Sequence, residues 1–191
     1  SGAEAVEAAI KTARKYAYVN ISKKKNEIVA FSDAFHGRTM MAIALNGSDR
    51  FIEGYGPMPG GIKHHQFNEV KGLEKTINKN TAAVIIELVQ GEAGIIKAQK
   101  TFIQRIKKLC KQHKALIVID EVQSGAGRTG TLFAYEQFGI KPDIMCCAKG
   151  IGGGIPIGAV LTSSKIADCM LLGSHGSTFG GNPLACAVAE K

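Results

Sequence analysis

The sequence predicts an α/β fold with a mostly parallel, mixed sheet flanked by helices. Two observations carry this prediction. Strand-like and helix-like segments alternate along the chain, and the strands are nearly continuous runs of Val, Ile and Leu, as in 82–86 and 115–119. Strands of that composition are buried on both faces, which is typical of sheets covered by helices on either side. The 191 residues are enough for one domain with a sizeable core.

The first half of the chain is predicted to begin with a helix. In residues 1–16, apolar side chains such as Val6 and Ile10 recur at helical spacing. The segments that follow alternate in type. They are a strand at 27–31, a short helix near 38–45, a glycine- and proline-rich loop over 46–61, a helix near 69–78 and a strand at 82–89.

The second half continues the alternation. Residues 101–114 predict an amphipathic helix, because Phe102 and Ile106 fall on one side. The next segments are a strand at 116–120, a segment over 131–139, and strands at 143–148 and 157–162. Asn182 and Pro183 then match the cap and first position of a helix that is just starting. Because the chain begins and ends inside helical patterns, we expect it to be a piece of a longer protein.

Composition excludes several classes of protein. The net charge of +8 comes from dispersed lysines without interleaved aromatic residues, which predicts solvated faces and no nucleic-acid partner, although a basic chain favours anionic small molecules. The longest apolar runs are strand-sized and fall short of the roughly 20 residues of a membrane span. Five cysteines without CxxC spacing indicate neither disulfides nor a metal site, so we predict a reducing compartment.

Polar residues follow the ends of three predicted strands. Glu87 ends one strand, and Lys149 ends another. Between them in the chain, Asp120 and Glu121 end a third. Because ligands bind at the carboxyl ends of the strands in such sheets, these four residues are expected to form one site.

Two nucleotide-binding alternatives fit poorly. Residues 116–121 resemble a Walker B strand, but a phosphate-binding GxxxxGK[ST] loop is required and the sequence has no Gly-Lys dipeptide. The chain could therefore belong to an ATPase only if the phosphate-binding loop lay outside this sequence. Residues 150–155 read GIGGGI, which fails the GxGxxG dinucleotide pattern at its last position and precedes a strand.

The pair of Asp120 and Lys149 suggests pyridoxal phosphate (PLP) chemistry. A lysine in an apolar surround has its charged form disfavoured, and its amine becomes a nucleophile toward carbonyl carbon. PLP also requires an acid facing its pyridine nitrogen and a phosphate cradle of backbone N–H groups at a helix start. The small residues Gly2 and Ala3 open the first helix. The structural alternatives are an ion-paired Asp120 and a lysine that extends its amine to solvent.

The motifs as a set resemble those of class III (subgroup II) aminotransferases of PLP fold type I. They cover nearly the whole chain: SGAEA (1–5), AFHGRT (34–39), QGEAG (90–94), IDEVQSGAGRTG (119–130), AKGIGGGIPIGA (148–159) and GSHGSTFGGNPLACAVA (173–189). The resemblance implies that 1–191 is part of the large, PLP-binding domain, without the family's N-terminal segment and C-terminal small domain. It also implies a homodimer with shared active sites, in the cytoplasm or, in a eukaryote, the mitochondrial matrix.

The resemblance assigns roles to the residues around the cofactor. Lys149 matches the Schiff-base lysine, which also moves the proton on the substrate carbon. Asp120 matches the acid on the pyridine nitrogen, and Gln123 the residue facing the ring hydroxyl. Val122 and Phe35 match the residues on the two ring faces.

The remaining matches concern phosphate and substrate. Gly2, Ala3 and Thr178 match phosphate contacts, the last of which the neighbouring subunit supplies in the family. The substrate-binding matches are Arg38, which binds the amino-acid carboxylate, Glu92, which pairs with an arginine of the small domain, and Ser177, which also comes from the neighbouring subunit. Leu88 stands where the family commonly has proline, and this departure removes no cofactor contact.

The resemblance implies a transaminase of amino and keto acids. The stretch GSHGSTFGGNP (173–183) favours N-acetylornithine as the donor of an ω-amino group and 2-oxoglutarate as its acceptor, in arginine biosynthesis. Ornithine, succinylornithine and 4-aminobutyrate enzymes share most other motifs and remain alternatives. A catalytically silent domain that keeps the fold for assembly is the alternative from another class.

Overall fold

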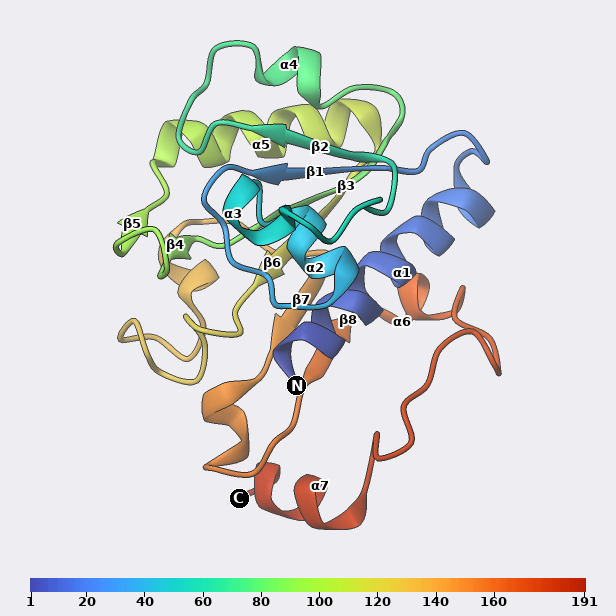
Figure 1. Cartoon of the computed structure of the whole chain (residues 1–191), viewed down its shortest axis with the longest axis vertical. Helices are drawn as coiled ribbons and strands as arrows, with labels where there is room; N and C mark the ends of the chain where they lie inside the picture. Colours follow the sequence, from blue (N-terminus) through green and yellow to red (C-terminus); the bar gives the residue numbers. More distant parts are fainter.

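The chain folds into three layers, with one mixed sheet between two layers of helices. The computed structural model describes all residues 1–191. The sheet has six strands in the order β2-β1-β3-β6-β7-β8, and β8 alone runs antiparallel to its neighbour. In Figure 1, α1 and α5 lie on opposite sides of this sheet. The α/β class and the mostly parallel, mixed sheet predicted from the sequence are confirmed.

The strands are short and hydrogen-bonded into parallel pairs from β2 to β7. Their bounds are β1 Glu27–Phe31, β2 Ile62–His65, β3 Thr81–Ile86, β6 Leu116–Asp120, β7 Ile144–Cys147 and β8 Ala159–Thr162. A separate two-stranded sheet pairs β4 (Val89–Gln90) with β5 (Ile96–Lys97).

The helices have the following bounds. They are α1 Gly2–Asn20, α2 Met40–Leu45, α3 Asp49–Ile52, α4 Leu73–Thr76, α5 Lys100–His113, α6 Ser164–Ala167 and α7 Pro183–Ala189, with 3₁₀ helices η1 Ala134–Gln137 and η2 Lys149–Gly152. The predicted cap of the last helix is confirmed, because the Asn182 side chain accepts a hydrogen bond from the Ala185 N–H. None of these helices is long and apolar enough to cross a membrane.

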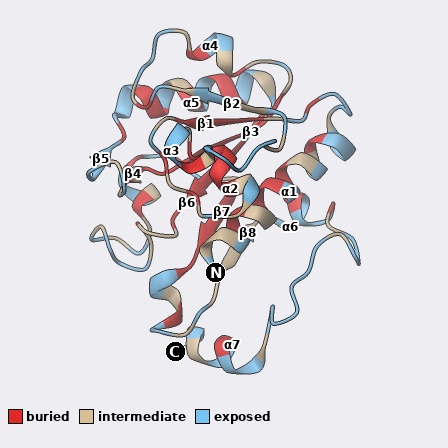
Figure 2. Ribbon diagram, in the orientation of Figure 1, coloured by how far each residue is buried: buried red, intermediate tan, exposed pale blue.

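Each face of the sheet has its own hydrophobic core. Successive residues of a strand point to opposite faces, so Ile117 and Ile119 of β6 join one core and Val118 joins the other. On the first face, Phe102 of α5 packs edge-on against Phe31 with ring centroids 5.1 Å apart. Figure 2 shows the central strands buried along their lengths. The near-continuous apolar runs in the sequence therefore reflect burial of the strands on both faces, as expected.

The second core is built on α1. The apolar stripe predicted for this helix is buried, including Val6, Ala9 and Ile10, and it packs on the central strands. Small side chains bring the helix close to β7, where the Cys146 thiol lies 3.7 Å from the carbonyl oxygen of Ala5. The amino end of α1 is thereby fixed at the carboxyl edge of the sheet.

Several predicted boundaries were wrong. The strand expected at 82–89 ends at Ile86, because Glu87 turns its carboxylate to the Phe35 N–H and Val89 pairs in the small sheet. The helix expected near 69–78 is the single turn α4, preceded by Gly72 with φ +81°. In the expected loop 46–61, the structure has the short helix α3.

Strands β2 and β5 and helix α6 were not predicted from the sequence. Strand β2 has the sequence IKHH at the sheet edge, where its side chains are at most partly buried and so form no apolar run. Strand β5 is exposed at both residues, and α6 is a single turn. Short or exposed elements leave little hydrophobic periodicity, which explains why sequence patterns did not show them.

Candidate active site

A cavity of about 430 Å³ lies at the carboxyl edge of the main sheet. Its walls come from the amino end of α1 and from the segments that follow β1, β3, β6 and β7. All seven residues assigned to the cofactor from this chain's own motifs line it: Gly2, Ala3, Phe35, Asp120, Val122, Gln123 and Lys149. The fold therefore brings together residues that are up to 147 positions apart in the sequence. The contacts that each of them makes with the cofactor remain predictions.

Asp120 is the buried anion of the cavity. It ends β6, is 4% exposed, and accepts hydrogen bonds from the Val122 N–H (3.0 Å) and from His36 Nδ1 (2.8 Å). Burial lowers the pKa of His36, but the hydrogen bond and charge of Asp120 outweigh that effect and raise it. The Nε2 atom of His36 is buried and has no hydrogen-bond partner.

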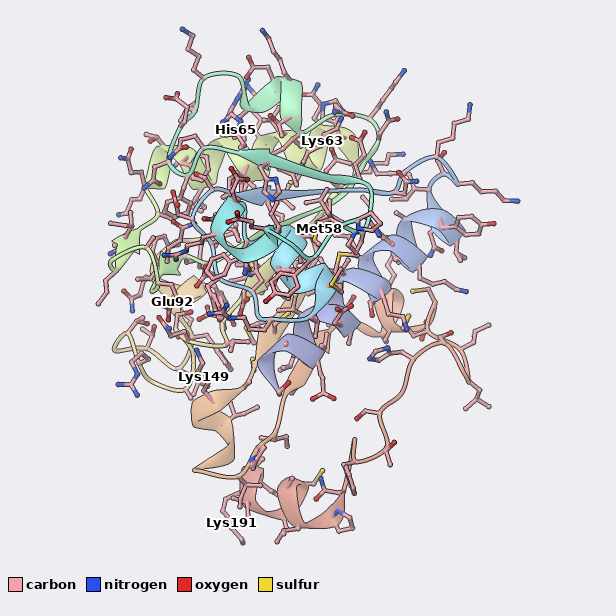
Figure 3. All side chains as sticks on the ribbon, viewed as in Figure 1. Met58, Lys63, His65, Glu92, Lys149 and Lys191 are labelled. Carbon is pink, nitrogen blue, oxygen red and sulfur yellow. The ribbon has the colours of Figure 1, made fainter.

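Lys149 stands where β7 ends and η2 begins (Figure 3). Its φ of +49° lies in the left-handed region, which costs roughly 1 kcal/mol or more for a non-glycine residue and is concentrated at functional sites. The glycine-rich segment that follows continues in the same region, because Gly153 and Gly154 also have positive φ. Lys149 follows the buried strand β7, and its own side chain is exposed at the cavity rim.

The amino end of α1 forms one wall of the cavity. A Cβ atom on Gly2 would lie 2.6 Å from a methyl carbon of Val122, so a larger residue would displace the side chain beside it. Ser1 caps the helix with a capping box that includes Glu4. First-turn N–H groups of a helix favour anions such as phosphate.

Arg38 stands beside the cavity rather than in it. Its guanidinium is exposed and lies over the rings of Phe35 (5.4 Å) and Phe51 (4.9 Å). These two rings contact each other edge to face, with centroids 5.8 Å apart. The arginine is thus held next to Phe35, which lines the cavity.

Three other assigned residues lie elsewhere in this chain. Ser177 borders a different cavity, where its hydroxyl donates to Glu4 at 3.4 Å. Thr178 is exposed and outside the main cavity. Glu92 is exposed after β4 and borders another hollow, outside the main cavity.

The four polar strand ends do not all meet. Glu87 lines the cavity with Asp120 and Lys149, but Glu121 does not. The Glu121 carboxylate turns the other way and accepts the N–H groups of Ala134 (3.1 Å) and Tyr135 (2.8 Å). Adjacent residues at a strand end point to opposite sides, so Glu121 supports η1 instead of the site.

Sequence patterns missed the buried contacts of His36. Its hydrogen bond to Asp120 joins residues 84 positions apart. No spacing rule connects two such distant residues. Its place beside Phe35 in AFHGRT was the available signal, and that signal indicates proximity to the cavity without naming a partner.

The cavity fits the cofactor expected from the sequence. The buried Asp120 carboxylate suits a protonated ring nitrogen, the open first turn of α1 suits a phosphate, and Lys149 supplies a primary amine. The apolar side chain of Val122 lies against Gly2 and lines the cavity together with the carboxylate of Asp120. The volume lies within the range of small-molecule sites.

Glu87 should make stability depend on pH. Burial raises the pKa of its carboxyl from 4.5 to about 7. The folded protein then holds a proton that the unfolded chain releases, so the free energy of unfolding falls as pH rises from about 4.5 to 7. The shift corresponds to roughly 3 kcal/mol. Glu87→Gln keeps an acceptor for the Phe35 N–H and removes the titration, so urea unfolding at several pH values should show a flatter profile.

The control is Glu53→Gln, which makes the same change at an exposed position. It should leave the pH profile of stability parallel to that of the parent protein. Parallel profiles for Glu87→Gln and the parent would contradict a titrating Glu87.

Over nearly its whole length, the chain is similar to aminotransferases. The family model described as "Aminotransferase class-III" matches residues 1–191. The succinylornithine transaminase of Yersinia pseudotuberculosis is 51% identical over 195 residues, covering 99% of this chain and 47% of that protein. The acetylornithine aminotransferase of Vibrio cholerae is 50% identical over 190 residues, covering 100% of this chain and 47% of that protein.

Solved structures of aminotransferases are also similar to the whole chain. The ornithine aminotransferase from Toxoplasma gondii ME49 superposes with a TM-score of 0.94 at 36% identity, covering 100% of this chain and 46% of that one. A second structure of that enzyme is described as showing partial occupancy of PLP at the active site. The chain spans about half the length of the curated relatives it matches.

Proposed function

The chain belongs to the class III aminotransferases, and from this premise we propose that the whole protein transfers the ω-amino group of an N-acylornithine to 2-oxoglutarate. Class III aminotransferases use PLP. The observation that carries the proposal is the gathering of Lys149, Asp120 and the amino end of α1 around one cavity. Relatives named for acetylornithine and for succinylornithine are equally similar at about 50% identity, so the acyl group is the open choice.

Bound PLP supplies an electron sink and a carrier for the amino group. Gly2 and Ala3 offer backbone N–H groups to the phosphate, and Val122 and Phe35 offer apolar surfaces to the ring. The negative charge of Asp120 would favour a protonated ring nitrogen, and its hydrogen bond with His36 keeps the carboxylate oriented. Together these groups would hold and orient the cofactor.

Lys149 is the proton carrier of the proposed reaction. Its amine would hold PLP covalently, and in its free form it would be the base that takes and returns a proton at the amino-bearing carbon of the substrate. Such a carrier needs a fixed backbone with a mobile side chain. The turn at Lys149 joins β7 to the glycine-rich segment and fixes its backbone, and the side chain is exposed rather than packed.

The domain and assembly are part of the proposal. The chain forms part of a large, PLP-binding domain, and the protein is a homodimer with shared sites. Ser177 and Thr178, which lie outside this chain's own main cavity, serve the cavity of the partner. Arg38 and Glu92 contact substrate from the exposed side. Five free cysteines suit the reducing cytoplasm.

The test is a comparison of amino donors with the full-length protein. Glutamate formation from 2-oxoglutarate is measured with N-acetylornithine, N-succinylornithine, ornithine and 4-aminobutyrate. The proposal expects one of the acylated donors to have the highest kcat/KM, by at least about tenfold over ornithine. Highest kcat/KM with ornithine or 4-aminobutyrate would move the protein to that branch, and the absence of turnover with all four would favour a silent domain.

A further inference from the structure

A second hollow, of about 820 Å³, lies at the opposite edge of the sheet. It is bounded by the second half of α1, the end of α5 and the amino ends of β6 and β7. We call it the lysine groove, after the six exposed lysines that line it: Lys107, Lys108, Lys111, Lys114, Lys141 and Lys165.

The positive charge of the lysine groove is not neutralised within the chain. None of its six lysines forms a salt bridge, and the single acidic residue in its lining is Asp143. The Asp143 carboxylate is already engaged, since it accepts the N–H of Ile117 at 2.8 Å. Of the six amines, Lys107 alone has an acceptor, the carbonyl oxygen of Gly139 at 2.6 Å.

The fold concentrates these charges from separate parts of the chain. Lys107, Lys111 and Lys114 follow helical spacing and so lie on one side of α5 and its cap. Lys141 precedes β7, and Lys165 belongs to α6, so distant segments converge on the same hollow. Like charges held together repel each other, and a bound anion would remove that repulsion.

The lysine groove is separate from the candidate active site. Leu116, the first residue of β6, lines the groove, whereas Asp120, the last residue of that strand, lines the active-site cavity. A strand of this length spans roughly 15 Å. No residue lines both the groove and the active-site cavity. A ligand in the groove therefore does not displace PLP or substrate.

We propose that the lysine groove binds a compact polyphosphate chain, either inorganic or carried by a nucleotide. Lysine ammonium groups bind phosphate oxygens as point charges, and several lysines around one hollow suit a ligand with several adjacent negative charges. The volume matches small-molecule sites. The lining has one aromatic residue, Tyr16, and so lacks the row of rings on which single-stranded nucleic acids stack.

The experiment is calorimetric titration of the full-length protein with inorganic tripolyphosphate, at 50 mM and 300 mM salt. We expect one site per chain and a fall in affinity of at least fivefold at the higher salt, because the attraction is electrostatic. The variant Lys108→Gln/Lys111→Gln/Lys114→Gln should weaken binding at least tenfold.

The matched control is Lys71→Gln/Lys75→Gln/Lys100→Gln, which removes the same charge from exposed lysines outside the groove. Equal weakening by both triple variants would overturn the proposal, since attraction to overall charge would then suffice. Absence of binding, or tighter binding of an oligodeoxythymidylate than of tripolyphosphate, would also overturn it. Adenosine triphosphate in a parallel titration distinguishes the two sources, because equal affinity means that the phosphate chain alone is recognised.

Discussion

Replacing Lys149 by alanine should reduce kcat of the full-length protein by at least about 10³-fold. Proton transfer by a positioned side chain contributes typically 10²–10⁴-fold, and the same amine is expected to hold the cofactor. Lys149 is exposed at the rim and its amine has no hydrogen-bond partner within the chain, so its removal should leave folding intact. The measurements are steady-state turnover and the thermal unfolding midpoint.

The control is Lys100→Ala, at an exposed position at the start of α5. Both variants should unfold within a few degrees of the parent protein. Borohydride reduction of the PLP-loaded parent, followed by peptide mass analysis, should place one pyridoxyl group on Lys149. A kcat for Lys149→Ala within tenfold of the parent, or label spread over surface lysines, would reject the assigned role.

The second large effect is expected for Asp120→Asn. The change keeps the size of the side chain and an oxygen for the Val122 N–H, but it removes the negative charge. A protonated ring nitrogen and the raised pKa of His36 both depend on that charge. We expect kcat to fall by about 10²–10⁴-fold, which is the range for loss of a charge placed at a developing transition state.

The readout that separates chemistry from folding is the absorption spectrum of bound PLP across pH. Asp120→Asn should shift the titration of the bound cofactor while binding stays measurable. The same chemical change at an exposed aspartate, Asp168→Asn, should alter neither kcat nor the spectrum. An active Asp120→Asn protein with an unchanged spectrum would mean that Asp120 acts only on His36 and the loop around it.

The elements that sequence patterns predicted well are those with a strong apolar signal. The stripe through Val6 and Ile10, the amphipathic helix α5 and the apolar runs of β3 and β6 all bury their apolar residues as expected. In contrast, β2 is short and half exposed, so its sequence IKHH contains no periodicity to detect. A strand that is buried on both faces has a continuous apolar run, and this run is what makes it detectable in the sequence.

The candidate site was predicted as a set of strand ends, and that rule was right for Asp120, Glu87 and Lys149 and wrong for Glu121. Position along a strand is visible in a sequence, but the direction of a carboxylate after the strand ends is not. The Glu121 side chain is directed by N–H groups of η1, which lie 13 and 14 positions away. The exposure of Lys149 likewise depends on how distant segments close around it.

The contact of α1 with β7 has a consequence for synthesis of the protein. The helix ends at Asn20 and its partner strand begins at Ile144, so more than a hundred residues separate them along the chain. At ribosomal rates of about 5–20 residues per second, the part of the apolar face of α1 that contacts β7 waits on the order of 10 s before β7 exists. During that interval the face is a target for chaperones and for aggregation, and closure of the sheet is a late, non-local step.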